Sequence, residues 1–190
     1  MDLLPGIFSA FGLSASAGLN AYIPLLVVAL LARFTNLMKL SPPWDALSSG
    51  WVIGLLLVLS LIEFFADKVP LVNHANDLIQ TFVRPVAGAI IFAASAHVLT
   101  DVHPVVSLAA GLLVAGGVHV VKAAAVRPAI TATTGGAANV PISFLEDLIS
   151  TVLSVLSVVL PVLIGILVIL FAAWIIWRLV GVFRPRPARV

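Results

Sequence analysis

The chain has 190 residues, of which 62% are hydrophobic and only 9% carry a charge. Soluble domains contain about 25% charged residues, because polar groups must surround the apolar side chains that reach the surface. These values exclude an ordinary soluble domain, a disordered chain and a nucleic-acid-binding protein. They predict an integral membrane protein whose main partner is the lipid bilayer.

Charged residues divide the chain into long uncharged runs, which cover residues 3–32, 46–62, 85–100, 102–121, 128–145 and 148–177. A helix needs about 20 apolar residues to cross roughly 30 Å of hydrocarbon. The runs are continuous in Leu, Val, Ile and Ala and do not alternate with polar residues, which indicates helices. We therefore predict an all-α polytopic transmembrane helical bundle of five or six spans. It forms one domain over residues 1–182, followed by a basic cytoplasmic tail at 183–190.

The first run, about residues 3–34, is too long for a simple crossing, because 30 residues of helix reach roughly 45 Å. Gly18 weakens a helix and Pro24 lacks a backbone N–H, so a break is expected between them. Asn20 and Tyr22 lie within this break. Unwound polar backbone in a membrane can bind substrates or ions, although close helix packing explains the small residues equally well.

Three further spans are expected near residues 49–66, 84–99 and 104–123, with a tight turn between the last two. Residues 70–83 have the pattern of an amphipathic helix on the membrane surface. The last run, 148–180, has Pro161 near its middle and is either one long kinked helix or the end of one span plus another.

Residues 127–147 are polar but contain no charge between Arg127 and the closing Glu146-Asp147 pair. Such a composition favours a second broken or re-entrant segment, which survives at membrane depth only beside protein or a wet cavity. Thr134 and Asn139 flank its glycines. A weak internal repeat, with halves at about 1–99 and 104–182, would relate the two breaks.

The distribution of basic residues bears on topology. Six crossings with both ends in the cytoplasm place eight of the ten Lys and Arg residues on the cytoplasmic side, and five crossings with the C-terminus inside place six there. Cytoplasmic loops are enriched in basic residues, which favours six. Six crossings require a tight turn near Pro161 that has no polar residue, so five stays open.

Four segments carry a resemblance to a known family: GLSASAGLNAYIPLL, FFADKVP, VRPVAGA and TGGAANVPISFLED. With them, the chain resembles, over roughly residues 5–180, an uncharacterised bacterial membrane-protein family catalogued as domain of unknown function 4126. The resemblance implies a multi-pass protein of the bacterial inner membrane. It implies no activity that could be transferred to these residues.

Charged residues near the ends of expected spans are the first candidates for a site. Glu63 and Asp67 share a helix face and could bind a cation or share a proton, or could simply end their span beside Lys68. Three basic residues could hold an anion at the start of a half-helix, or could only set the topology. They are Arg84, Lys122 and Arg127. Glu146 and Asp147 could be site residues, or first-turn residues of a helix beginning near Leu148, with Ser143 and Glu146 at capping-box spacing.

No cofactor is expected, because phosphate-binding, dinucleotide-binding and nucleophile-elbow motifs are all missing from the sequence. The chain contains no cysteine, and its histidines lack metal-site spacing, so no metal is expected either. No catalytic constellation is recognisable. His119 is expected to be a buried, hydrogen-bonded histidine.

Together these features favour a channel or secondary transporter for a small ion or polar solute. The two breaks would meet to form the site, with Glu63 or Asp67 coupling protons or cations and the basic residues holding an anionic group. A chain this small is expected to act as a homo-oligomer. The alternative is a non-transporting membrane assembly or phospholipid-binding protein.

Overall fold

A computed structural model describes residues 3–68, 70–97 and 103–183, and within these ranges the regular structure is helical. The short turn expected near residue 100 falls mostly, and the tail at 183–190 almost entirely, outside the described residues. In chain order the elements are α1 (Leu3–Leu19), α2 (Tyr22–Phe34), the 3-10 helix η1 (Trp44–Ser48), α3 (Gly50–Ala66), α4 (Pro70–His97), α5 (Pro104–Val121), the π-helix η2 (Lys122–Val126), α6 (Arg127–Thr134), α7 (Asn139–Val159) and α8 (Pro161–Phe183).

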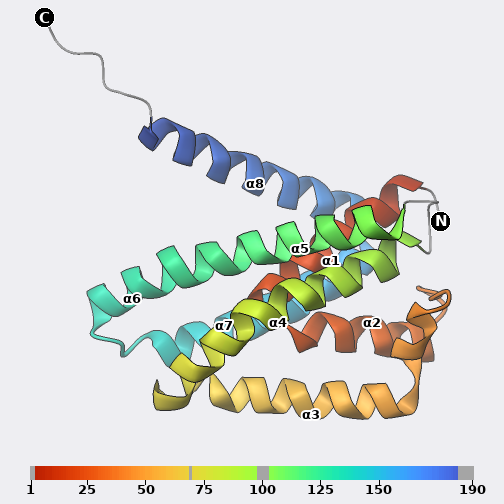
Figure 1. Cartoon of the computed structure of the whole chain (residues 1–190), viewed down its shortest axis with the longest axis horizontal. Coiled ribbons are helices and arrows are strands. Elements are labelled where there is room, and N and C mark those ends of the chain that lie inside the picture. The colour runs from red at the N-terminus through yellow and green to blue at the C-terminus, as the bar shows by residue number, and fades with distance from the viewer. Residues whose placement is uncertain (1–2, 69, 98–102, 184–190) are drawn as a thin grey trace, which may run out of the picture.

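Helices α1 and α2 form a hairpin whose tip lies inside the bundle (Figure 1). The start of α1 and the end of α2 lie at the same end of the molecule, and the chain turns between Asn20 and Ala21. Helix α1 runs antiparallel to α7, since Gly12 lies against Ser157 and Asn20 bonds Asp147. The break expected between Gly18 and Pro24 is therefore confirmed, and the chain reverses its direction there.

The segment 70–83 is not a separate surface helix. It is the first half of α4, which continues without interruption to His97. The amphipathic pattern arises because α4 buries polar residues such as Gln80 and Arg84 against other helices. A polar stripe that faces protein has the same spacing as one that faces water.

The second break is a turn at the outside of the bundle, and the prediction that both breaks meet is wrong. The turn joins α6 to α7, and Figure 1 shows it at one end of the molecule. Gly135 and Gly136 have φ values of 61° and 90°, which glycine adopts at little cost. Thr134 and Asn139 are exposed or half-buried and bond within this turn.

The last apolar run is two helices. Leu160 leaves helical geometry, with φ −127° and ψ 57°, and Pro161 starts α8. Proline suits the first position of a helix, because its missing N–H has no helical partner there. Among the described residues, four helical stretches are long and apolar enough to cross a membrane, within α4, α5–α6, α7 and α8, and three shorter apolar helices accompany them.

Helix α1 is the centre of the bundle and packs through small residues on two faces. Ser14 donates to the carbonyl oxygens of Gly88 and Gly111 on α4 and α5. On another face, Ser16 bonds Ser150 and Ser154 of α7 at 2.9 and 2.7 Å. Small residues allow backbones to approach and hydroxyls to bond across helices, which drives association in lipid, where the hydrophobic effect is lost.

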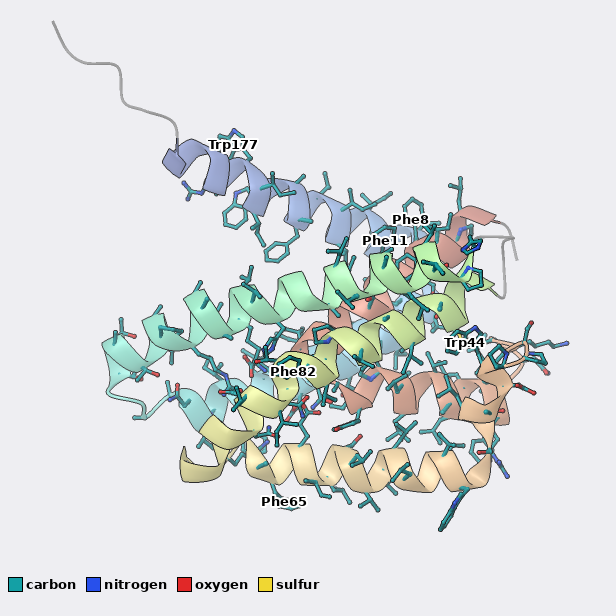
Figure 2. All side chains as sticks on the ribbon, in the orientation of Figure 1. Phe8, Phe11, Trp44, Phe65, Phe82 and Trp177 are labelled. Atoms are coloured by element: carbon teal, nitrogen blue, oxygen red, sulfur yellow. The ribbon has the colours of Figure 1, made fainter. Side chains whose placement is uncertain are left out.

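Large apolar side chains cover the outside. Figure 2 shows Phe65 and Trp177 pointing away from the bundle, and both are more than 60% exposed. Exposed aromatic and aliphatic surface of this extent suits contact with lipid and would be unfavourable in water. Apolar side chains thus cover the outside of the bundle, while its interior holds both an apolar core and buried polar side chains.

We expect Gly111→Ala to lower the free energy of unfolding by about 1–3 kcal/mol, because an added Cβ overpacks the α4–α5 contact. That Cβ would lie 2.6 Å from Phe92 Cβ and 2.7 Å from Ala89 Cα. Gly117→Ala, on the same helix in open space, is the control and is expected to be neutral or slightly stabilising. Thermal unfolding in detergent compares them, and equal melting temperatures would contradict the packing described.

Candidate functional site

The site is built around a fully buried ion pair between α3 and α4. Arg84 Nη2 lies 2.9 Å from Glu63 Oε1, and neither side chain is exposed to solvent. Glu63 ends up here because it lies near the end of α3, where this helix meets the tip of the α1–α2 hairpin. A charge buried without a partner is costly, so each of these two residues requires the other.

Asp67 extends the pair to other helices. Its Oδ2 atom lies 3.7 Å from Arg84 Nη2 and 3.6 Å from Arg127 Nη2, and its Oδ1 atom accepts a 2.7 Å hydrogen bond from the Asn76 amide. Asp67 caps the end of α3 one turn after Glu63. The expectation that Glu63 and Asp67 share one face is confirmed, because both face Arg84.

A π turn brings two cations to the same side of the α5–α6 helix. Lys122 and Arg127 are five residues apart, which would separate them by about 140° around an α-helix. In η2 the Arg127 N–H donates to the Lys122 carbonyl oxygen, and both side chains reach Glu146. Lys122 Nζ lies 2.8 Å from Glu146 Oε2 and Arg127 Nη2 lies 3.3 Å from it, while Arg127 Nη1 also bonds Asp77 at 3.1 Å. π turns occur often at functional sites.

Lys68 links the end of α3 to α7. Its ammonium lies 3.1 Å from Asp147 Oδ2 and donates to the Phe64 carbonyl oxygen at 2.9 Å. The rings of Phe64 and Phe144 lie 3.4 and 4.2 Å from it, a cation–π arrangement. The Lys68–Asp147 pair therefore closes one side of the site.

The charged residues also hold the two ends of the broken helix. Lys122 donates to the Leu19 carbonyl oxygen at the end of α1, and Glu63 accepts from the Ala21 N–H at the start of α2. A cation at a helix C-terminus and an anion at an N-terminus are both favourable. Asn20 donates to Asp147, and its oxygen accepts from the N–H groups of α2's first turn.

His119, on α5, faces α4, and the hydrogen bonds that its ring makes there determine its tautomer. Arg84 can only donate, so its Nη1 donates to His119 Nδ1 at 3.3 Å. The Thr81 hydroxyl already donates to the Asp77 carbonyl oxygen, so it accepts from His119 Nε2. His119 is therefore neutral with its proton on Nε2, and the expectation of a buried, hydrogen-bonded histidine is confirmed.

We call nine charged side chains the charge network. They are Glu63, Asp67, Lys68, Asp77, Arg84, Lys122, Arg127, Glu146 and Asp147. Ion pairs link seven of them to one another, and the separate Lys68–Asp147 pair is tied to these seven through Asn20 at the hairpin tip. The structure thus brings together eight charged residues singled out from the sequence, with Asn20 beside them. Tyr22 lies next to the network in the first turn of α2 and packs into the apolar core.

Two candidate residues, Thr134 and Asn139, do not join the network. They bond within the α6–α7 turn, at the outside of the bundle. Glu146 and Asp147 are also not in a first helical turn, because α7 begins at Asn139 and not near residue 148. The capping role expected for Ser143 and Glu146 is wrong for the same reason.

Sequence reasoning missed Asp77 and Asn76 as site residues. Both lie in the first half of α4, which had the pattern of a helix on the membrane surface. The length of the helical segment could have revealed them. Helix α4 spans 28 residues with Arg84 near its middle, so Asn76 and Asp77 belong to the same helix as Arg84. Within the described residues, no group of three or more His, Cys, Asp and Glu side chains is placed to hold a metal ion.

The chain belongs to the family described as Domain of unknown function (DUF4126), whose match covers residues 7–180. This confirms the resemblance noted in the sequence. Neither the curated proteins nor the solved structures compared with the chain include a match. The family match covers the hairpin from residue 7 onward and the whole charge network.

We expect Arg84→Met to lower the free energy of unfolding by about 3–5 kcal/mol, because it leaves Glu63 buried without its cation. Glu63→Leu is expected to have a similar effect, and the double variant to recover part of the loss, since no buried charge of the pair remains but the Ala21 N–H and Asp67 each lose a partner. Thermal unfolding of the four proteins measures this cycle. Arg178→Met, which changes an exposed arginine, is the control. Additive losses in the double variant would show that the pair is not coupled.

Proposed function

We propose that the protein is a channel or secondary transporter for a small ion or polar solute. The observation that supports it is the buried charge network at the tip of a re-entrant hairpin, in a bundle whose outside is apolar. Ionisable residues inside membrane proteins are costly and occur mainly on ion paths, proton relays and substrate sites. Interrupted helices occur at the binding sites of many transporters.

The network favours a cation over an anion. Its five carboxylates exceed its four Lys and Arg side chains, so its formal charge is −1 with His119 neutral. The anion site expected from the sequence is less well supported, since Arg84, Lys122 and Arg127 are all paired with carboxylates. For the same reason these residues offer little to a phospholipid headgroup.

The hairpin gives the network a means to act on the fold. Three contacts join the tip to charged side chains: Lys122 to the Leu19 carbonyl, Glu63 to the Ala21 N–H and Asp147 to Asn20. A change of charge on Lys122, Glu63 or Asp147 would weaken the hydrogen bond between that side chain and the hairpin tip. Binding of an ion would in this way be coupled to movement of α1 and α2.

The arrangement also suggests an orientation in the bacterial inner membrane. Helix α2 carries Arg33 in its last turn and ends at one end of the bundle, and Lys39 follows it in the chain. Helix α3, which ends just before Lys68, α6, which begins with Arg127, and α8, which carries Arg178, all run toward the opposite end (Figure 1). The end of a helical membrane protein that carries more Lys and Arg residues faces the cytoplasm. The C-terminus would therefore be cytoplasmic and the N-terminus outside. A re-entrant hairpin with five crossings would therefore give the charge distribution that sequence reasoning assigned to six. The homo-oligomer stays a prediction.

We expect Thr134→Cys to react with a membrane-impermeant thiol reagent from the cytoplasmic side and Asn36→Cys from the opposite side. Both positions are exposed, and the chain contains no other cysteine. Labelling of intact cells and of inverted vesicles makes the measurement. Labelling of both positions from one side would contradict the five-crossing topology.

Transport itself is tested with the purified protein in liposomes, against a broad set of ions and polar solutes. We expect Glu63→Gln to reduce flux at least tenfold, because it removes a charge that holds the hairpin tip. Asp45→Asn, in the loop segment η1 before α3, is the matched control and should keep wild-type flux. Unchanged flux in Glu63→Gln would contradict the mechanism. Absence of any flux, with anionic lipid that copurifies and is released by Arg84→Ala, would favour lipid binding.

A further inference from the structure

Some buried polar side-chain atoms have no hydrogen-bond partner within the protein. Among the described residues they are the hydroxyls of Ser9, Ser60, Ser95, Ser107 and Ser143, together with Gln80 Oε1 and Arg84 Nε. A serine hydroxyl can rotate toward a carbonyl oxygen of its own helix, so the serines need no further group. Gln80 and Arg84 differ from them, because their polar atoms lie farther from the backbone of α4, where the N–H and carbonyl groups already bond each other.

Arg84 is held in place by its other two nitrogen atoms. Its Nη2 atom lies 2.9 Å from Glu63 Oε1, and its Nη1 atom donates to His119 Nδ1 at 3.3 Å. The side chain is fully buried, and a guanidinium group in a protein does not lose its protons. The Nε–H group therefore remains a donor that needs an acceptor, and it cannot turn away without breaking a bond to Glu63 or His119.

Gln80 presents the complementary group one helical turn earlier. It lies four residues before Arg84 on α4, so the two side chains share a helix face. Gln80 is only 2% exposed, and its Oε1 atom can only accept a hydrogen bond. Buried polar atoms without a partner are rare in folded proteins, and each one calls for an explanation. The two residues thus offer one donor and one acceptor, at neighbouring positions, to a group from outside the chain.

We propose that Gln80 Oε1 and Arg84 Nε–H together bind a hydroxyl group, which belongs to a small neutral solute or to a water molecule. The oxygen of this hydroxyl accepts from Arg84, and its O–H donates to Gln80. If the hydroxyl belongs to a solute, this is where the transported molecule is recognised. That role rests on the proposed transport function, whereas hydroxyl binding does not.

The chemistry of the two atoms selects against ions. A metal cation could approach Gln80 Oε1 but would meet the positive charge of Arg84. An anion could accept from Arg84, but it has no proton for Gln80 and would come close to Glu63. A hydroxyl group satisfies both atoms and adds no charge, and sites built in this way discriminate strongly against analogues that lack the hydroxyl. A cation attracted by the net charge of the network would bind its carboxylates instead.

Access to this site depends on the hairpin tip. Neither Gln80 Oε1 nor Arg84 Nε is open to solvent. Glu63 holds Arg84 and also accepts from the Ala21 N–H at the start of α2. A movement of α2 that frees Glu63 would therefore free Arg84 as well, and the two polar atoms could then take up or give off a hydroxyl group.

Infrared spectra of the wild-type protein in liposomes test the binding, because Gln80 is the only glutamine in the chain. A carbon isotope label at Cδ of glutamine therefore shifts one side-chain carbonyl band away from all others. We expect this band at the frequency of a hydrogen-bonded carbonyl, either in buffer alone, where water is the donor, or after addition of glycerol, a neutral polyol. The frequency of a free carbonyl under both conditions would overturn the proposal.

Stopped-flow light scattering of liposomes distinguishes a solute from water. After a jump in external glycerol, the shrinkage of the vesicles reports water movement and the later reswelling reports glycerol movement. We expect the wild-type protein to accelerate reswelling, and Gln80→Leu, which lacks the acceptor, to slow it at least tenfold. Ser95→Ala removes another buried polar group of α4 without a partner and, as the matched control, should keep the wild-type rate.

The other outcomes of this experiment also decide the proposal. Unchanged reswelling in Gln80→Leu would overturn the role in solute recognition. A loss of rapid shrinkage alone would assign the site to water and overturn the same role.

Together the two measurements separate this proposal from the proposed function. A hydrogen-bonded Gln80 carbonyl in a protein that accelerates no flux would support the site and contradict only transport. A free carbonyl in a protein whose flux does not depend on Gln80 would overturn the site and leave transport standing. The infrared measurement uses the wild type, so it remains decisive even if Gln80→Leu does not fold.

Discussion

An interrupted helix inside an apolar bundle leaves backbone groups that need partners, and the rest of this structure depends on how they are satisfied. Asn20 and Ala21, which join the end of α1 to the start of α2, are buried, so the backbone groups there depend on partners from the protein. Lys122 and Glu63 supply charges of the signs that these helix ends favour. Glu63 then requires Arg84, and Lys122 requires Glu146, so one break accounts for much of the network.

The network and the small-residue packing have separate tasks. Serines and glycines let α1 approach α4, α5 and α7 closely, which fixes the position of the hairpin. Charged residues act only at its tip. The deep Glu63–Arg84 pair contributes little net stability, because desolvation offsets attraction, but it makes the structure sensitive to the loss of either charge.

Most of the site could be predicted because charges are rare in this sequence. In an apolar chain, a charged residue near a span can be accommodated at few positions without a large cost in free energy. Glu63, Arg84 and Lys122 therefore indicated the site even before their partners were known. Thr134 and Asn139 did not indicate the site, because a Gly-rich polar segment has the same composition whether it forms a break inside the bundle or a turn at its surface. Asp77 was missed because a helix face that meets buried polar groups has the same period as one that meets water.

The sequence by itself determined the class of protein, its helical secondary structure and the place of the first break, since these depend on local composition and on glycine and proline. It left open which way the chain goes after that break. Only the tertiary structure decided that α2 returns to the end where α1 begins, because this direction depends on packing against α3 and α7. The tertiary structure also decided which charged residues pair with each other. Residues as distant in sequence as Asn20 and Asp147 meet only after the helices have packed.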